Sequence, residues 1–250
     1  PDLDEKPFIE AVLQQTGAEE HTVTPRGEEL MQTAPRLVWH QGEPFGSTTI
    51  YAQWHVMQLA RSAGITVLLD GQGADELLAG YSHYYSSFWA DLIRTGCLTA
   101  LWREWKSFPY HLELDPYRSL GAALRRLALH LAKRDRLSFV AAAPTWLDPQ
   151  FAAQCADESQ WTRRNPHCAS VLDEHLYDSL TRSSLPSLLH YEDHNSMAFS
   201  IEARVPYLDY RLIELCYSLP VHLKINKGTT KVILREAARS IVPEMVRTRQ

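Results

Sequence analysis

The sequence contains no hydrophobic run long enough to cross a membrane. Runs such as residues 65–69 stop well short of the roughly 18 apolar residues that a membrane helix needs. The start of the chain, residues 1–6, is polar and lacks the features of a signal peptide. Basic residues are not in excess either, because 25 Lys and Arg stand against 30 Asp and Glu, a formal net charge of -5. We therefore expect neither a nucleic acid nor a membrane as partner, because either requires a basic face.

Cysteine is scarce as well. Cys97, Cys155, Cys168 and Cys216 lie far apart and form no Cys-x-x-Cys pair. We expect free thiols in a reducing, cytoplasmic setting rather than a disulfide framework. The 250 residues, of which 45% are hydrophobic and 22% charged, are enough for one large globular domain or two small ones. Because the chain begins with Pro1 instead of Met, we expect it to be a piece of a longer protein.

The first third of the chain alternates helix-like and strand-like patterns. Apolar residues at helical spacing predict a helix between Asp4 and Gly17, and residues 20–24 predict a short strand. A second helix is predicted over residues 50–63. Residues 65–69 are β-branched and aliphatic without alternation, which predicts a strand that is buried on both faces of a parallel sheet.

The rest of the chain is predicted to be mainly helical. Amphipathic segments fill residues 86–133, and helical patterns return over residues 185–197, 209–219 and 229–242. We therefore expect a partial α/β core over residues 1–90, followed over 91–250 by the helical remainder of the same domain. Six aromatic residues in the middle region are interpreted as core: Tyr81, Tyr84, Tyr85, Trp89, Trp102 and Trp105.

A glycine-rich turn is the most informative feature. The predicted strand at residues 65–69 leads into Asp-Gly-Gln-Gly-Ala-Asp-Glu-Leu, residues 70–77. Ligands of open α/β sheets bind at the carboxyl ends of strands, where such turns lie, and glycine allows a ligand to approach the backbone closely. Asp75 and Glu76 offer the oxygen ligands that Mg²⁺ prefers. The alternative is a turn without a ligand, whose acids are favoured by the dipole of the following helix.

Two common phosphate-binding motifs do not fit this turn. The pattern Gly71-x-Gly73-x-x-Glu76 begins like a dinucleotide fingerprint, but an acid replaces the third glycine and would repel a pyrophosphate unless a metal intervened. A Walker loop is excluded because no Gly-Lys-Ser/Thr occurs in the sequence.

A second polar cluster lies near the C-terminus. Asn195, Glu202, Arg204 and Asp209 occur among core-like residues, and they suit either a hydrogen-bonded network or recognition of a zwitterionic substrate. Glu202 and Arg204 are the candidate substrate residues, since the planar guanidinium of Arg204 can bind both oxygens of a carboxylate. A buried ion-pair network that holds helices together is the alternative.

Two further patterns are compatible with ion binding. Lys231 is predicted in the first turn of a helix beside a glycine-containing loop, a position that suits an anion, although a lysine there can equally be solvent-exposed. His190 and His194 are spaced i, i+4 and would share one face of a helix, as zinc ligands do. The pattern is not His-Glu-x-x-His and offers no third ligand, so zinc is the weaker interpretation.

Taken together, three blocks resemble the synthetase domain of the asparagine synthetase family. Residues 67–81 resemble the block Ser-Gly-Glu-Gly-Ala-Asp-Glu-Leu-Phe-Gly-Gly-Tyr. Residues 185–212 are similar to Leu-Arg-Tyr-x-Asp-Arg-x-Ser-Met-Ala-x-Ser-x-Glu-Ala-Arg-Val-Pro-Phe-Leu-Asp, and residues 228–235 to Gly-x-x-Lys-x-x-Leu-Arg. The resemblance covers nearly the whole chain and is weakest over residues 95–170.

The resemblance implies a fold and a reaction. The fold would be a Rossmann-like ATP-pyrophosphatase, of the adenine nucleotide alpha hydrolase type, whose parallel sheet carries a large helical portion. The enzyme would be an ATP- and Mg²⁺-dependent carbon-nitrogen ligase that activates aspartate to β-aspartyl-AMP and releases pyrophosphate. Ammonia from a separate N-terminal glutaminase domain would then give asparagine. A homodimer is a candidate oligomeric state.

The resemblance also implies roles for single residues. Asp70, Gly71 and Gly73 would line the ATP site, and Asp75 would bind Mg²⁺. Lys231 would hold the departing pyrophosphate, and Gln72 would occupy the position of the general base. Positioning and charge neutralisation dominate such chemistry.

Two departures from the family pattern limit what can be carried over. The family's Ser-Gly-Gly-x-Asp-Ser loop does not occur in these 250 residues, so the chain alone is predicted to be inactive. Gln72 stands where the family has Glu, and Gln cannot accept a proton, so Asp70 is a candidate replacement. A relative that amidates another carboxylate or closes a β-lactam or peptide ring is one alternative function. A non-catalytic binding module is the other.

Overall fold

The computed structural model describes residues 4–108, 115–131 and 170–249, together with Asp148, Gln150 and Cys168. Contacts between residues divide the chain into two compact units, each built from discontinuous segments. The first unit comprises Pro1–Asp75, Ser183–Ser218 and Ile233–Gln250, and the second comprises Glu76–Arg182 and Leu219–Val232. The predicted division of one domain at residues 90 and 91 stays a prediction.

The elements of the first unit, in chain order, are α1 (Lys6–Thr16), η1 (Gly27–Glu29), α2 (Leu30–Gln41), α3 (Thr48–Ser62), β1 (Val67–Leu69), α10 (Ser184–Met197), β2 (Glu202–Arg204), η6 (Pro206–Leu208), α11 (Tyr210–Ser218) and α13 (Glu244–Arg247). The second unit contains α5 (Tyr84–Arg94), α6 (Leu98–Lys106), α7 (Pro116–Leu131), α9 (Val171–Thr181), η7 (Val221–Leu223), β3 (Ile225–Asn226) and β4 (Thr229–Thr230). Helices α4 (Ala74–Leu78) and α12 (Val232–Ala237) continue from one unit into the other.

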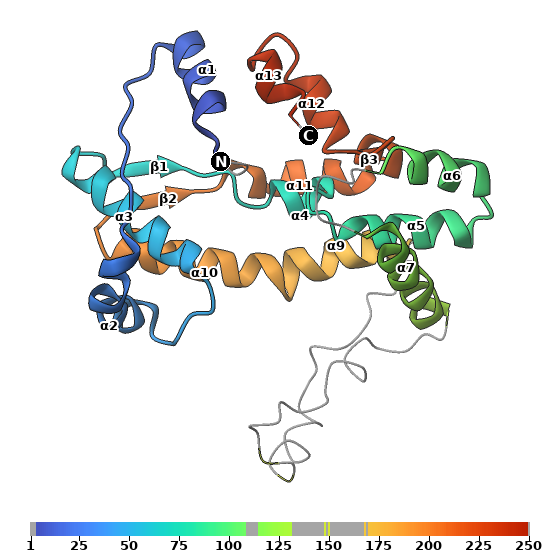
Figure 1. Cartoon of the computed structure of the whole chain (residues 1–250), viewed down its shortest axis with the longest axis horizontal. Coiled ribbons are helices and arrows are strands. Elements are labelled where there is room, and N and C mark those ends of the chain that lie inside the picture. Colours follow the sequence, from blue (N-terminus) through green and yellow to red (C-terminus); the bar gives the residue numbers. More distant parts are fainter. Residues whose placement is uncertain are drawn as a thin grey trace. The chain divides into compact units, whose positions relative to one another are not determined.

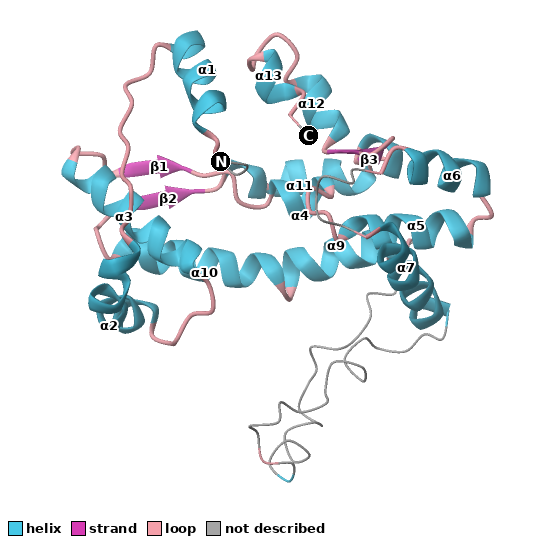
Figure 2. Ribbon diagram, in the orientation of Figure 1, coloured by secondary structure: helices cyan, strands magenta, loops and turns pink. Residues whose placement is uncertain are grey.

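A parallel pair of strands organises the first unit. β1 and β2 lie side by side (Figure 1), with Val67 opposite Glu202 and Leu69 opposite Arg204. Their inner face packs against α3 through a cluster of apolar side chains: Met57, Ala60, Ile65, Leu68, Phe199 and Ile201. The predicted α/β character is thus confirmed, although helices predominate in the ribbon (Figure 2).

The prediction that this strand is buried on both faces is wrong. Val67 and Leu69 are 40% and 74% exposed, because their side chains point to the face opposite α3. The unbroken apolar run correctly indicated a strand. Whether a second layer covers it depends on segments far away in the sequence.

Two local predictions in the first unit had opposite outcomes. Helix α1 forms where predicted, since Asp4 accepts a hydrogen bond from the backbone N–H of Lys6 and Gly17 ends the helix with a φ of 67°. The strand predicted at residues 20–24 is wrong, because these residues are exposed and pair with no strand of the described chain. A strand without a partner leaves its backbone groups to water.

In the first unit, helices α2, α3 and α10 share a core of Leu37, Ile50, Tyr51 and Trp54. α3 begins after Ser47, whose Oγ accepts the backbone N–H of Thr49. This confirms the predicted helix over residues 50–63. α10 and α11 likewise confirm the helices predicted over residues 185–197 and 209–219.

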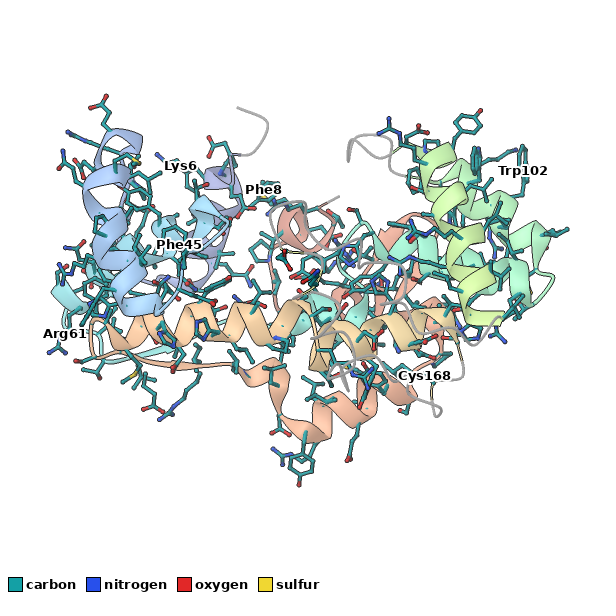
Figure 3. The ribbon with its side chains drawn as sticks, turned by 90° about the horizontal axis from the view of Figure 1, so that it is seen from below. Lys6, Phe8, Phe45, Arg61, Trp102 and Cys168 are labelled. Carbon is teal, nitrogen blue, oxygen red and sulfur yellow. The ribbon has the colours of Figure 1, made fainter. Side chains whose placement is uncertain are left out.

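The second unit is helical with a largely aromatic core, as predicted. Tyr84, Tyr85 and Trp89 of α5 are fully buried, and the rings of Tyr85 and Trp89 pack against Phe108. Trp102 is the exception, because it is 60% exposed and points away from its helix (Figure 3). Prediction of Trp102 as a core residue was therefore wrong.

The helix predicted over residues 229–242 is also wrong at its start. β3 and β4 form an antiparallel hairpin whose two turn residues, Lys227 and Gly228, have φ values of 48° and 74°. Two successive positive φ angles are typical of a type I′ hairpin turn, which favours glycine. α12 begins only at Val232, and Lys231 precedes it with a φ of 53°.

Two remaining predictions concern composition. Three of the four cysteines, Cys97, Cys168 and Cys216, lie in the described residues, and no disulfide joins any two of them. Within the part of the chain that the structure describes, no helix has both the length and the hydropathy that crossing a bilayer requires.

Candidate active site

The glycine-rich turn lies at the carboxyl edge of the parallel strand pair, as the sequence predicted. The backbone N–H of Asp70 donates to the carbonyl of Arg204 over 2.8 Å and continues the pairing beyond β1. The Asp70 carboxylate then accepts the backbone N–H of Gln72 over 3.2 Å and forms an Asx turn. The strand thereby delivers Asp70 and Gln72 together to the edge where open α/β sheets bind their ligands.

Gly73 is required by the geometry of this turn. Its φ of 93° is unfavourable for any residue with a side chain, and a Cβ atom there would lie 2.3 Å from Cδ2 of Leu208. Gly71 differs, because a Cβ there would meet no atom within 4 Å. Glycine at position 71 therefore leaves open space on the turn, whereas Gly73 allows η6 to pack against it.

Helix α4 begins directly after the turn. Asp75 lies in its first turn and is half-buried, while Glu76 is buried. Asp70 is also half-buried, so two acids at this edge remain within reach of solvent. The carboxylate oxygens of Asp75 fit a hard divalent cation in type.

One carboxylate at this edge is enough for Mg²⁺ in a nucleotide site. Within the described segments, no three His, Cys, Asp or Glu side chains converge as a metal cluster. Mg²⁺ in a nucleotide site needs only one or two protein carboxylates, because phosphates and water complete its shell. Asp75 is compatible with that arrangement, and its role stays a prediction.

Glu192 of α10 is a fourth acid at this edge, and sequence reasoning missed it. The residue is only 1% exposed, yet neither of its carboxylate oxygens has a hydrogen bond of ordinary geometry to any described residue. The side chains of Asp70 and Gln72 nevertheless lie close enough to act on its ionisation. Burial, and after it the negative charge of Asp70, raise the pKa of Glu192 to about 7, although contact with the Gln72 amide opposes the shift.

The sequence does carry a signal for Glu192. The buried residues of α10 are Leu185, Glu192, Asn195 and Ser196, whose spacing marks one face of the helix. An acid on the buried face of a helix is unusual and invites a search for its partner. That partner lies about 120 residues earlier in the chain, so it became visible only in the folded protein.

Asn195 has a structural role. Its side chain accepts a hydrogen bond from Gln41 of α2 over 2.8 Å and donates to Gln53 and to the carbonyl of Ile50 in α3. These bonds tie α10 to both neighbouring helices.

The two histidines of α10 meet the end of α2. His190 contacts the carbonyl of Gln41 over 3.2 Å, and His194 contacts the carbonyl of His40. These carbonyls belong to the last turn of α2, where no intrahelical partner exists. The i, i+4 spacing therefore serves to join two helices in this structure.

Glu202 and Arg204 lie next to each other on the open face of the strand pair. Nε of Arg204 donates to Oε1 of Glu202 over 2.8 Å, and the two side chains are about 60% exposed. Hydrogen bonding and charge attraction between them lower the pKa of Glu202 and raise that of Arg204. The alternative that they form a buried network between helices is wrong, because they remain accessible from solvent.

Asp209 is not bonded to that pair. Its carboxylate accepts hydrogen bonds from the side chain and the backbone N–H of Arg211, which lower the pKa of Asp209 to about 2. The four polar residues that the sequence grouped together thus do not form one network, because Glu202 and Arg204 bind each other while Asn195 and Asp209 bind other residues.

Lys231 belongs to the second unit, where it is half-buried and precedes α12. Its predicted contact with an anion stays a prediction.

Comparison with known proteins gives a consistent picture. The family model described as Asparagine synthase matches residues 1–250. The chain is 26% identical over 250 residues to asparagine synthetase (glutamine-hydrolyzing) 1 of Bacillus subtilis, an alignment that covers 89% of this chain and 35% of that protein. It is 28% identical over 233 residues to a putative asparagine synthetase (glutamine-hydrolyzing) of Mycobacterium tuberculosis, covering 88% and 34%.

A fungal protein also matches: amidase chyE of Penicillium rubens is 23% identical over 274 residues, covering 97% of this chain and 40% of that protein. The chain therefore spans roughly a third of the length of the curated relatives that it matches.

Proposed function

Because the chain belongs to the asparagine synthase family, we propose that it is the synthetase part of an enzyme that activates a carboxylate with ATP and converts it to an amide. The observation that carries the proposal is the group of Asp70, Gln72 and Glu192 at the carboxyl edge of a parallel strand pair, in a chain that the family model matches throughout. An ATP-pyrophosphatase fold of Rossmann type is part of the proposal, supported by the order strand, glycine-rich turn and helix.

Nucleotide binding is assigned to the turn. Asp70, Gly71 and Gly73 line the ATP site, and the open space beside Gly71 allows the nucleotide to approach the backbone. Asp75 holds Mg²⁺, which supplies charge neutralisation to the phosphates. Lys231 holds the departing pyrophosphate as a further cation.

The proposed acceptor of the adenylyl group is the side-chain carboxylate of aspartate. One carboxylate oxygen attacks the α-phosphorus of ATP and the bond to pyrophosphate breaks, which gives β-aspartyl-AMP. Ammonia then attacks the acyl carbon, AMP leaves, and asparagine forms. Glu202 and Arg204 are exposed enough to meet a zwitterionic substrate, and the Arg204 guanidinium matches a carboxylate.

The source of ammonia is assigned to another part of the full-length protein. The bacterial relatives are named as glutamine-hydrolyzing, and we propose that a glutaminase domain of the full-length protein delivers ammonia in the cytoplasm. This chain, without that domain and without the Ser-Gly-Gly-x-Asp-Ser loop, is proposed to be inactive on its own.

The test uses the full-length protein with ATP, Mg²⁺, aspartate and either glutamine or an ammonium salt. We expect aspartate-dependent release of AMP and pyrophosphate with formation of asparagine. Pyrophosphate release that another carboxylate stimulates, while aspartate does not, would reassign the substrate to a related amide- or ring-forming ligase. Absence of AMP with every carboxylate tried would contradict the enzyme assignment and support a binding module.

A further inference from the structure

Position 72 poses a chemical problem for amide formation. An amine that attacks an acyl-adenylate must lose a proton, and the Gln72 side chain cannot accept one. The Glu192 side chain contacts both Asp70 and Gln72, and the Asp70 carboxylate accepts the backbone N–H of Gln72. Two carboxylates that could accept a proton therefore lie near position 72, one in the turn and one on α10.

We propose that Asp70 and Glu192 form a carboxylate pair that accepts the proton released by the attacking amine. The inference rests on the proposed function and adds to it the group that replaces the base missing at position 72. Asp70 is half-buried, whereas Glu192 on α10 is only 1% exposed.

The step balances as follows. The lone pair of ammonia forms the new C–N bond at the acyl carbon, and the nitrogen becomes positively charged. One N–H proton passes to the carboxylate pair, and the C–O bond to AMP breaks as the carbonyl re-forms. The pair, now carrying one more proton, returns it to water after the amide leaves.

Two neighbouring carboxylates suit this task because they cannot easily both ionise, so they hold one proton at a pH near neutrality. The raised pKa of Glu192, about 7, agrees with that arrangement. The Gln72 amide has the opposite effect, since contact with it stabilises the ionised form of Glu192 and thereby keeps the pair able to accept a proton.

Asn195 provides an internal comparison, because it lies on the same buried face of α10. Its side-chain oxygen accepts one hydrogen bond and its nitrogen donates two. These bonds fix the side chain in place, as expected of a residue with a structural role. Glu192, three residues earlier, has both oxygens buried without such a bond among the described residues. Leaving a buried carboxyl unsatisfied costs stability, and perturbed groups of this kind cluster at functional sites.

Other titratable groups lie on α10 and on the elements packed against it: Arg36 and His40 of α2, Tyr51, His55 and Arg61 of α3, Glu202 and Arg204 of β2, and His190, Tyr191, Asp193 and His194 of α10 itself. Because the charge of these groups can also change with pH, a pH experiment must compare amide formation with a second reaction of the same protein.

The experiment compares two partial reactions in the full-length protein. Aspartate-dependent exchange of labelled pyrophosphate into ATP reports formation of the adenylate. Asparagine formed from an ammonium salt reports amide formation. Glu192→Gln is expected to lower amide formation about 100-fold or more, as loss of a general base does, while the exchange rate changes less than about threefold.

Two further variants make the result specific. Asp193→Asn removes an exposed acid from the next position of α10 and is expected to leave both rates unchanged. The double substitution Glu192→Gln with Gln72→Glu returns a carboxylate to the same place. Its rate of amide formation is expected to be at least about tenfold higher than that of Glu192→Gln alone, because a carboxylate is present again. Repair of a merely structural defect would not explain that increase. Asp70→Asn is less specific, because Asp70 is also placed in the ATP site.

Should Glu192→Gln fail to fold, the unmodified protein gives the answer. Amide formation per unit of free ammonia is expected to fall about tenfold relative to exchange between pH 8 and pH 6, as the pair with a pKa near 7 takes up its proton. A constant ratio over that range overturns the inference.

The outcomes separate the two proposals. Exchange that is absent from the unmodified protein with every carboxylate overturns the proposed function and the inference together. Exchange that is present, with normal amide formation by Glu192→Gln, overturns the inference alone. A variant that loses exchange and amide formation equally shows that Glu192 supports the fold or adenylation, and it also overturns the inference.

Discussion

Two buried acids of the second unit, Asp91 and Glu104, accept hydrogen bonds from backbone N–H groups, whereas Glu192 of the first unit accepts none in the described part of the chain. In the second unit, Asp91 accepts the backbone N–H groups of Val171 and Leu172 over 2.9 Å each, and it thereby caps α9. Glu104 accepts the N–H groups of Lys227 and Gly228 and holds the β3–β4 hairpin. In the first unit, Glu192 is equally buried and accepts no such bond from the described residues.

The contrast separates two reasons for burying a charge. A carboxylate that accepts several N–H bonds contributes to stability, because those donors would otherwise be orphaned at a helix end or a turn. A carboxylate that is buried beside a second carboxylate destabilises the fold and is retained where its reactivity matters. Replacing each of these acids by a neutral residue should therefore change the free energy of unfolding in opposite directions.

The largest expected effect is at Asp91. Asp91→Ala should lower the free energy of unfolding by about 4 kcal/mol, because it leaves two buried N–H groups at the start of α9 without an acceptor. Urea denaturation measures the change. Asp91→Asn keeps the shape and one acceptor and should lose about half as much. A loss below about 1 kcal/mol for Asp91→Ala would contradict the role of this acid as a cap.

Glu192 should behave in the opposite way. A carboxyl whose pKa is raised from 4.5 to about 7 binds more protons when folded, so its contribution to stability falls as the pH rises from about 4.5 to 7 and stays lost above 7. Glu192→Gln should therefore raise the free energy of unfolding at pH 8, by up to about 3 kcal/mol, and change it little at pH 4.5. A variant that is less stable at pH 8 would show that the carboxylate is stabilising.

A smaller loss is expected in the turn itself. Gly73→Ala should cost about 2 kcal/mol, because its φ of 93° is strained for alanine and its Cβ would overlap Leu208. Gly71→Ala is the matched control, since a Cβ there meets no atom within 4 Å. Thermal melting of both variants checks the difference. Equal melting temperatures would contradict the packing of η6 against Gly73.

The smallest effect is expected at the exposed pair. Glu202→Gln should not measurably change the melting temperature, since an ion pair that is about 60% exposed contributes little. The same variant should weaken the use of the carboxylate substrate, measured as an increase in its KM. An unchanged KM would remove Glu202 from the proposed substrate site.

Local signals predicted the parts of this fold that local chemistry decides. Asp4 and Gly17 mark the ends of α1, and the sequence from Val67 to Gly73 predicts a strand that leads into a turn at a sheet edge. These features depend on caps, propensity and glycine conformations, all of which lie within a few residues.

The features that sequence reasoning missed depend on distant partners. Residues 20–24 have a strand-like composition, but no strand of the described chain pairs with them. The outer face of β1 is exposed because nothing in the described part of its unit covers it. Glu192 was overlooked for the same reason, since its importance comes from Asp70 and Gln72 far along the chain.

The most direct test of the account measures stability and chemistry on one sample. For Glu192→Gln in the full-length protein at pH 8, we predict a higher free energy of unfolding together with amide formation that is reduced about 100-fold. Lower stability with an unchanged rate of amide formation would contradict it, because Glu192 would then be a structural acid like Asp91.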